Sequence, residues 1–198
     1  MGFWRTVYRE ARDVLGLPPP VETAVQLAER IRDEVAGDLG GLKSRAGEGS
    51  DVPWVLTTEL EGREVVLTCH PDGLRVSWRI ASTLGGGPAF RLVAETHSAA
   101  DPASARKAIG TGLNLEADDA DALGTEEMLW KALPTGTRGN LTSLIQRLVG
   151  RFTFEDDFFL LDTEAEFLAS SGAASQLRSQ TRTIARLVGE VEQAWSAL

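Results

Sequence analysis

Alternating apolar and polar residues between positions 54 and 96 constrain the fold of this 198-residue chain more than any other feature. The alternation runs through four segments: Trp54 to Leu60, Val65 to Cys69, Leu74 to Ile80 and Phe90 to Thr96. Turn-forming residues separate the segments at Glu61-Gly62, Pro71-Asp72-Gly73 and Gly85 to Pro88. Because side chains of a strand point alternately to its two faces, the pattern predicts an antiparallel meander with one buried face.

Apolar residues at helical spacing flank these strands. They predict two helices within residues 1–39, separated by three prolines, and further helices over 126–133, 141–149 and from about Ser175 onward. The apolar stripe of the last helix consists of Leu177, Thr181, Ile184, Val188, Val191, Trp195 and Leu198. Phenylalanines on both sides of Glu155-Asp156-Asp157 predict a hairpin, and Leu113 and Leu115 indicate a further short strand.

Helices on one side of an antiparallel sheet define the α+β class. We therefore expect an α+β fold with a β-meander of four or more strands, a helical layer, a C-terminal amphipathic helix and a helical N-terminal extension. Glycines are frequent in residues 40–51, which is typical of a flexible connector. This composition predicts a helical extension with its linker over residues 1–48 and a single α+β domain over residues 49–198.

Charge and composition narrow the range of functions. With 29 acidic and 20 basic residues the net charge is −9, which argues against binding to nucleic acid and to anionic membranes. A single cysteine, Cys69, excludes an internal disulfide, and no apolar stretch approaches the roughly 18 residues that span a bilayer. We expect a cytoplasmic protein. Only three of the basic residues are lysines, which together with abundant alanine and glycine is typical of a high-GC bacterium.

Residue types that carry catalysis are present but poorly placed for it. His70 and His97 fall on the polar phase of their strands, whereas Cys69 falls on the apolar phase, so Cys69 and His70 point to opposite faces. Ser104 and Lys107 match the spacing of a serine–lysine nucleophile motif whose partner motifs are missing.

Two segments resemble ligand loops without completing the pattern. The acidic run Glu116, Asp118, Asp119, Asp121, Glu126 and Glu127 could bind Ca²⁺ or Mg²⁺, but Leu123 and Trp130 occupy positions where oxygen ligands belong. The alternative to a metal site is a solvated loop that leads into a helix capped at Thr125. Residues 135–140 lack the lysine of a phosphate loop and are interpreted as a turn between helices. The sequence therefore predicts no catalytic residue, no metal ligand and no cofactor.

The sequence indicates contacts with a partner more clearly than it indicates catalysis. Phe3, Trp4, Val7 and Tyr8 lie with three arginines on the first helix, so residues 1–17 could enter a partner's groove or contact a membrane surface. The alternative is that this helix docks on its own sheet. Arg178, Arg182 and Arg186 recur every four residues on the last helix and either meet a charged partner or pair with the acidic hairpin.

These observations predict a non-enzymatic protein-interaction or scaffold module of a bacterial cytoplasm, with a protein partner or self-association through the C-terminal stripe. One alternative is a small-ligand-binding domain that holds an apolar ligand on the open sheet face or between the layers, near Trp54 and Trp78. The other alternative is an enzyme that depends on carboxylates.

Overall fold

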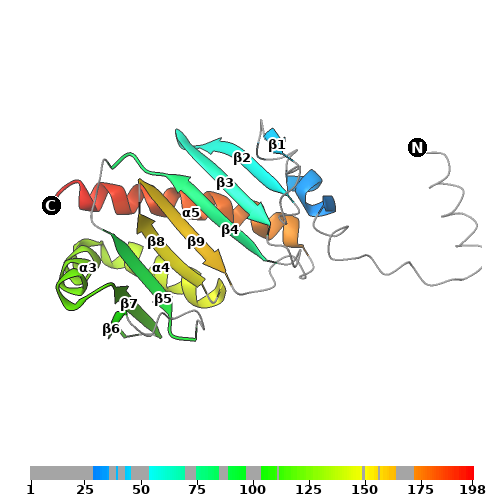
Figure 1. The fold of residues 1–198 in the computed structure, drawn as a ribbon. Coiled ribbons are helices and arrows are strands. Elements are labelled where there is room, and N and C mark those ends of the chain that lie inside the picture. Colours follow the sequence, from blue (N-terminus) through cyan, green and yellow to red (C-terminus); the bar gives the residue numbers. More distant parts are fainter. Residues whose placement is uncertain are drawn as a thin grey trace, which may run out of the picture.

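The computed structural model describes residues 29–35, 39, 43–45, 54–69, 75–84, 89–96, 104–110, 112–148, 150–155, 157–163 and 172–198. The fold is α+β, as expected. The described strands form a nine-stranded antiparallel sheet, and helices pack against it (Figure 1). Six residues singled out in the sequence lie outside the described residues, so their predicted roles remain predictions: Phe3, Trp4, Val7, Tyr8, His70 and His97.

The strands are β1 Lys43–Arg45, β2 Val55–Leu60, β3 Arg63–Cys69, β4 Val76–Ala81, β5 Phe90–Ala94, β6 Ala105–Ala108, β7 Leu113–Ala117, β8 Gly150–Glu155 and β9 Phe158–Thr163. Their order in the sheet is β1-β2-β3-β4-β9-β8-β5-β7-β6. Strands β2 to β4 form a meander, as predicted, and β1 pairs with β2 at its outer edge. The fourth alternating segment, β5, does not continue it, because the β8–β9 hairpin pairs with β4 on one side and with β5 on the other.

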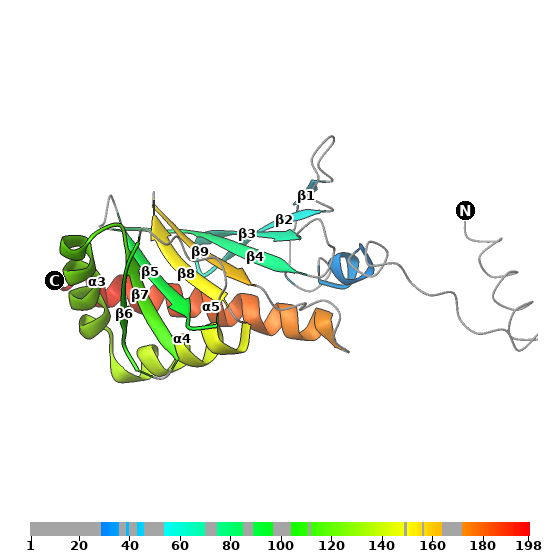
Figure 2. The same cartoon turned by 60° about the horizontal axis from the view of Figure 1, so that its bottom comes forward.

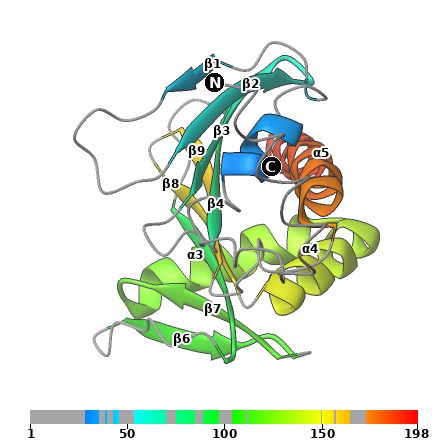
Figure 3. The same cartoon turned by 90° about the vertical axis from the view of Figure 1, so that its right-hand side faces the viewer.

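The helices are α3 Ala120–Ala132, α4 Thr135–Leu148 and α5 Ala173–Trp195, with a further helical segment over residues 29–35. Helices α4 and α5 lie side by side on one face of the sheet (Figures 2 and 3). No helix of the described part is long and apolar enough to cross a membrane.

Several boundaries differ from those predicted. Helix α3 begins six residues before position 126 and is capped by Asp119, whose side chain accepts from the backbone N–H of Ala122 at 2.8 Å, so Thr125 lies inside the helix and is not its cap. Residues 135–140 form the first turns of α4, although we expected a turn between helices there. The short strands β1 and β6 were not predicted.

The apolar stripe of α5 faces the protein's own sheet. Its members from Leu177 to Trp195 are buried, and the Trp195 ring lies 5.1 Å from that of Phe90 and 5.7 Å from that of Phe154, centroid to centroid. Leu198, which we placed on the stripe, lies beyond the end of the helix and is 69% exposed. Self-association through this stripe is therefore contradicted, because the sheet already covers it.

The buried core extends into the segment that we expected to be an extension. Ile31 and Val35, on the helical segment 29–35, and Leu39 belong to the same apolar cluster as the strands. The Oγ1 of Thr58, on β2, donates to the Leu39 carbonyl at 3.2 Å. The boundary at residue 48 remains a prediction.

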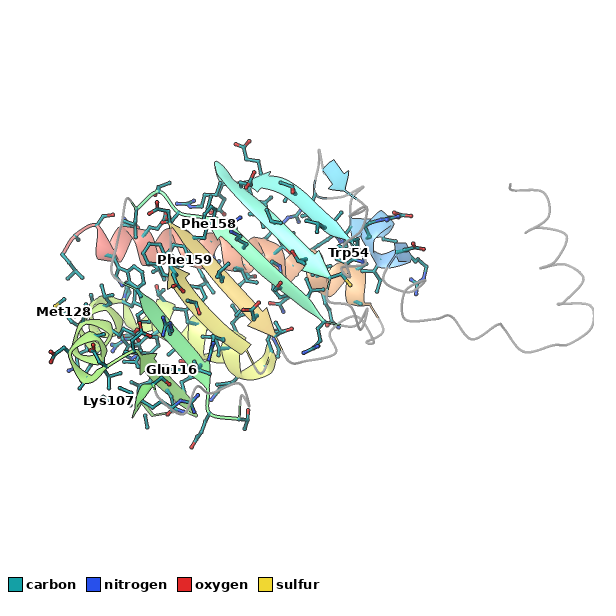
Figure 4. All side chains as sticks on the ribbon, in the orientation of Figure 1. Trp54, Lys107, Glu116, Met128, Phe158 and Phe159 are labelled. Atoms are coloured by element: carbon teal, nitrogen blue, oxygen red, sulfur yellow. The ribbon has the colours of Figure 1, made fainter. Side chains whose placement is uncertain are left out.

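Neighbouring residues of β9 show the two faces of the sheet (Figure 4). Phe159 is buried in the core and contacts the Phe154 ring at 4.7 Å. Phe158 is half-buried on the other face, where the Arg79 guanidinium lies 3.4 Å from its ring centre. The alternation seen in the sequence thus separates an apolar helix-side face from a mixed outer face.

Candidate functional site

A groove runs between α4 and α5. It has a volume of about 350 Å³ and is lined by Asn140, Ser143, Leu144 and Arg147 from α4 and by Ser179, Gln180, Thr183 and Arg186 from α5. Residues three and four apart lie on the same face of a helix, so each helix contributes one continuous row of lining side chains. Seven of the eight lining residues are polar, in contrast to the apolar rows that the same helices turn toward the sheet.

Each end of the groove carries an arginine. Helices α4 and α5 run antiparallel (Figure 2), and Thr137 near the start of α4 donates to Glu190 near the end of α5 at 2.8 Å. Arg147 therefore lies toward the Ser179 end of the groove and Arg186 toward the Asn140 end. Positions 140 and 147 are separated by about 10 Å along the helix axis, given a rise of about 1.5 Å per residue.

The two arginines are only weakly neutralised. Arg186 has one carboxylate neighbour, Glu190, at 3.7 Å, and both side chains reach solvent. Arg147 is exposed and forms no ion pair with another described residue. Exposed ion pairs contribute about 0–1 kcal/mol. Both guanidinium groups are therefore available to an anionic ligand.

Gln180 forms part of the groove wall and is buried, with 8% of its surface exposed. Its Oε1 atom has no hydrogen-bond partner among the described residues. Leaving a buried acceptor unpaired costs about 1–3 kcal/mol. A ligand that brings a hydrogen-bond donor to this wall would remove that cost once the amide turns toward it.

Helix α5 is anchored to the sheet near its C-terminal end. Glu192, which is buried, accepts from Arg63 Nε at 3.2 Å, from Ser82 Oγ at 2.9 Å, and from the backbone N–H and the hydroxyl of Thr83 at 2.7 and 2.9 Å. Burial alone would raise the pKa of Glu192, but these hydrogen bonds outweigh it and hold the pKa below its ordinary value. The carboxylate is thus ionised and fixes one wall of the groove.

The three arginines predicted to contact a partner differ in their surroundings, and that role stays a prediction. Arg186 lines the groove, Arg182 is exposed on α5 without an ion pair to a described residue, and Arg178 is half-buried. Neither Arg182 nor Arg186 forms an ion pair with the described part of the acidic hairpin. Sequence reasoning missed Arg147 and Gln180, because only the packing of α4 on α5 brings them to one surface.

The other residues singled out in the sequence have structural partners. Cys69 is buried, as predicted. Ser104 donates to Glu116 at 2.8 Å, whereas Lys107 contacts Glu127, so Ser104 and Lys107 do not form a nucleophile pair. Among the described residues, no three His, Cys, Asp or Glu side chains are grouped so as to hold a metal ion.

The tryptophans that we associated with a ligand are core residues. Trp54 and Trp78 are both buried, and the Trp78 indole donates to Thr181 of α5. Neither lines the groove between α4 and α5. An apolar ligand site beside them between the layers is not supported by this packing.

Comparison with known proteins gives a fold and no family. No family model and no curated protein matches the sequence. The crystal structure of the mycobacterial trehalose monomycolate transport factor A, TtfA, superposes on this chain with a TM-score of 0.55, covering 83% of this chain and 95% of the TtfA chain. At 11% sequence identity, this likeness shows that the chain shares its fold with TtfA.

Proposed function

We propose that this chain is a non-enzymatic interaction module of a bacterial cytoplasm that holds an acidic segment of a protein partner in the α4–α5 groove. The observation that supports this proposal is the pair of solvent-facing arginines, Arg147 and Arg186, at the two ends of one polar groove. The chain as a whole has a net charge of −9. A cationic groove on an acidic protein attracts an acidic partner locally, while the overall charge disfavours nucleic acid.

The dimensions of the groove suggest what the segment looks like. In the polyproline II conformation a chain advances about 3.1 Å per residue with three residues per turn, so two acidic side chains three residues apart point to the same side and are separated by about 9 Å. That spacing is close to the length of the groove between positions 140 and 147, and an arginine lies at each end of the groove. Ser143, Gln180 and Thr183 between them offer hydrogen bonds to the backbone of the segment.

The shared fold supports an accessory role by analogy. TtfA is named a transport factor, and we propose that this chain likewise acts by holding a partner and not by catalysis. Phe3, Trp4, Val7 and Tyr8 remain our proposed second contact, for a protein or a membrane surface. Arg178 and Arg182 do not line the groove and take no part in this proposed contact, and their role in partner binding stays a prediction from the sequence.

A peptide display experiment tests the proposal without knowledge of the partner. Random twelve-residue peptides are selected on the wild-type protein and on the double variant Arg147→Glu/Arg186→Glu. We expect enrichment of peptides with two acidic residues three apart on the wild type only. The affinity of an enriched peptide, measured by fluorescence anisotropy, is expected to fall at least about tenfold in the double variant, which corresponds to about 1.4 kcal/mol.

Arg182→Glu is the matched control, because it reverses one exposed charge on α5 outside the groove. It is expected to change the affinity much less than either Arg147→Glu or Arg186→Glu. Equal losses in all three variants would show that the overall charge of this surface governs binding, and would contradict a site in the groove. Selection of the same peptides by the wild type and the double variant would rule out the groove.

A further inference from the structure

A second, smaller cavity lies where α3 meets the sheet. It has a volume of about 150 Å³ and is lined by Ala89, Arg91, Asp118, Ala122, Thr125 and Glu126. Arg91 belongs to β5, Asp118 follows β7 directly, and the remaining lining residues of α3 come from its first two turns. Since a water molecule occupies about 30 Å³ in the liquid, the space corresponds to about five water-sized groups.

Glu126 is the unusual residue in this cavity. It is buried, with 2% of its surface exposed, and its Oε2 atom has no hydrogen-bond partner among the described residues. The backbone N–H of Arg91 is a hydrogen-bond partner of the Glu126 carboxyl. Neither this backbone group nor the neighbouring guanidinium, which pairs with Asp118, satisfies Oε2.

The ionisation of Glu126 reflects this environment. Burial raises the pKa of Glu126 to about 7, against the lowering effect of Arg91, and Asp118 and Glu116 raise it further. Glu116 is itself paired with Arg106 of β6 and with Arg151 of β8. The carboxyl thus lies in a site where the charged groups of the described residues leave its negative charge undercompensated.

The surroundings favour a cation. Asp118, Asp119 and Asp121 are exposed at the junction of β7 and α3, so the approach to the cavity is acidic. The methyl groups of Ala89, Ala122 and Thr125 give part of the wall an apolar character suited to a hydrocarbon stem. A buried charge is stabilised when it is paired with an opposite charge and hydrogen-bonded.

We propose that this cavity binds a primary ammonium group on a short unbranched alkyl stem, with Glu126 as its anionic partner. The ammonium donates to the carboxylate oxygen that now lacks a partner, and three or four methylene groups fill the part lined by alanine and threonine. The same chemistry is offered by a free alkylamine and by a lysine side chain of a protein partner. This site is separate from the α4–α5 groove and does not depend on its proposed function.

The first test uses n-butylammonium chloride as the probe and follows the Glu126 carboxyl by ¹³C NMR. An ammonium ligand favours the ionised carboxyl, so binding is expected to lower the pKa of Glu126, by about one unit at ten times the dissociation constant. Binding is also expected to strengthen as the pH rises through 7. n-Butanol, which has a similar shape and no charge, is the matched control and should not lower the pKa.

Two variants separate ligand binding from folding. Glu126→Gln keeps the shape of the side chain and is expected to abolish butylammonium binding, whereas Glu127→Gln, at the half-buried neighbouring position that pairs with Lys107 and Lys131, should leave it unchanged. Ala122→Leu fills the cavity while keeping the carboxyl, and is expected to prevent the shift of the Glu126 pKa. If butylammonium leaves the Glu126 resonance and its pKa unchanged in the wild type, the cavity holds water alone and the proposal is wrong.

The source of the ammonium is distinguished by a second probe, Nα-acetyl-lysine N-methylamide. If this probe competes with butylammonium, the cavity admits a lysine side chain that carries its backbone, as a protein partner would present it. If butylammonium binds and the lysine probe does not, the site is one for a free amine. Both results support the ammonium site, and failure of peptide selection at the α4–α5 groove would not affect either one.

Discussion

The indole Nε1–H of Trp78, in the middle of the sheet, donates to Thr181 Oγ1 on α5 at 3.0 Å. The Thr181 hydroxyl in turn donates to the Leu177 carbonyl at 2.7 Å. Both residues are buried, so this short chain of hydrogen bonds connects β4 to α5 inside the apolar layer. It sets the position of α5 along the sheet, and with it one wall of the groove.

Substitution Thr181→Val is expected to destabilise the protein by about 1–3 kcal/mol, because it removes the acceptor for the buried indole N–H without changing the size of the side chain. Urea denaturation of the two proteins measures the difference. Thr181→Ser retains the hydroxyl and should recover most of the loss. Equal stability of the valine variant and the wild type would show that this hydrogen bond contributes nothing.

Glu192 is expected to make the protein acid-sensitive. Its pKa is lowered in the folded state relative to 4.5, so its stabilising contribution is complete above pH 4.5 and is lost as the pH falls through the folded-state pKa. Glu192→Gln removes one partner of a buried ion pair and is expected to cost roughly 3 kcal/mol at pH 7. The difference in the free energy of unfolding between variant and wild type, measured by urea denaturation, should become smaller below pH 4.5. A gap that stays constant down to pH 3 would contradict the ionic role of Glu192.

The contribution of Glu126 to stability is expected to depend on pH in the opposite direction to that of Glu192. Its pKa rises from 4.5 to about 7 on folding, so the folded state holds this proton more tightly than the unfolded chain does. The contribution of Glu126 to the free energy of unfolding is fully present below pH 4.5 and is lost as the pH rises to about 7. The total loss is about 3 kcal/mol. Glu126→Gln does not titrate and should gain stability relative to the wild type over this range. Parallel curves of stability against pH for the two proteins would rule out the raised pKa.

Gln180→Leu is expected to separate stability from binding. It replaces a buried amide that has an unpaired oxygen with an apolar side chain of similar size, so we expect equal or higher stability, by up to about 1 kcal/mol. Binding of an acidic peptide to the groove should weaken, because the wall loses its hydrogen-bonding group. Thermal denaturation and fluorescence anisotropy measure the two effects. A variant that loses stability and keeps its affinity would assign Gln180 a purely structural role.

The strands were predictable from sequence wherever a buried face imposes alternation. Val65, Leu67 and Cys69 are buried, whereas Glu64, Val66 and Thr68, which alternate with them, are not, as the alternation indicates. The strand β6 was not predictable from alternation, because Ala105–Ala108 is an edge segment with two basic residues and its side chains do not contribute to the core. The first turns of α4 were missed because Gly136, Thr137 and Gly139 are poor helix formers, whose conformation depends on packing.

The candidate sites were predictable only in part. Arg186 was identified from its spacing, but its neighbour across the groove, Arg147, lies on another helix, and nothing in the sequence indicates which helices become adjacent. The acidic run around Asp118 and Glu126 was noticed as a possible metal loop. The position of Glu126 beneath β5 depends on the pairing of β5 with β7, which brings residues 91 and 118 together after a separation of 27 positions.

The place of the β8–β9 hairpin between β4 and β5 has a consequence for biosynthesis. When the first 149 residues have left the ribosome, β4 and β5 have no neighbours on their facing edges, and the aromatic cluster around Trp195 has not been made. Exposed edges of this kind are where nascent chains associate with one another. Completion of the sheet therefore waits for the last quarter of the polypeptide, and a chain truncated before residue 150 has two halves with no strand to join them.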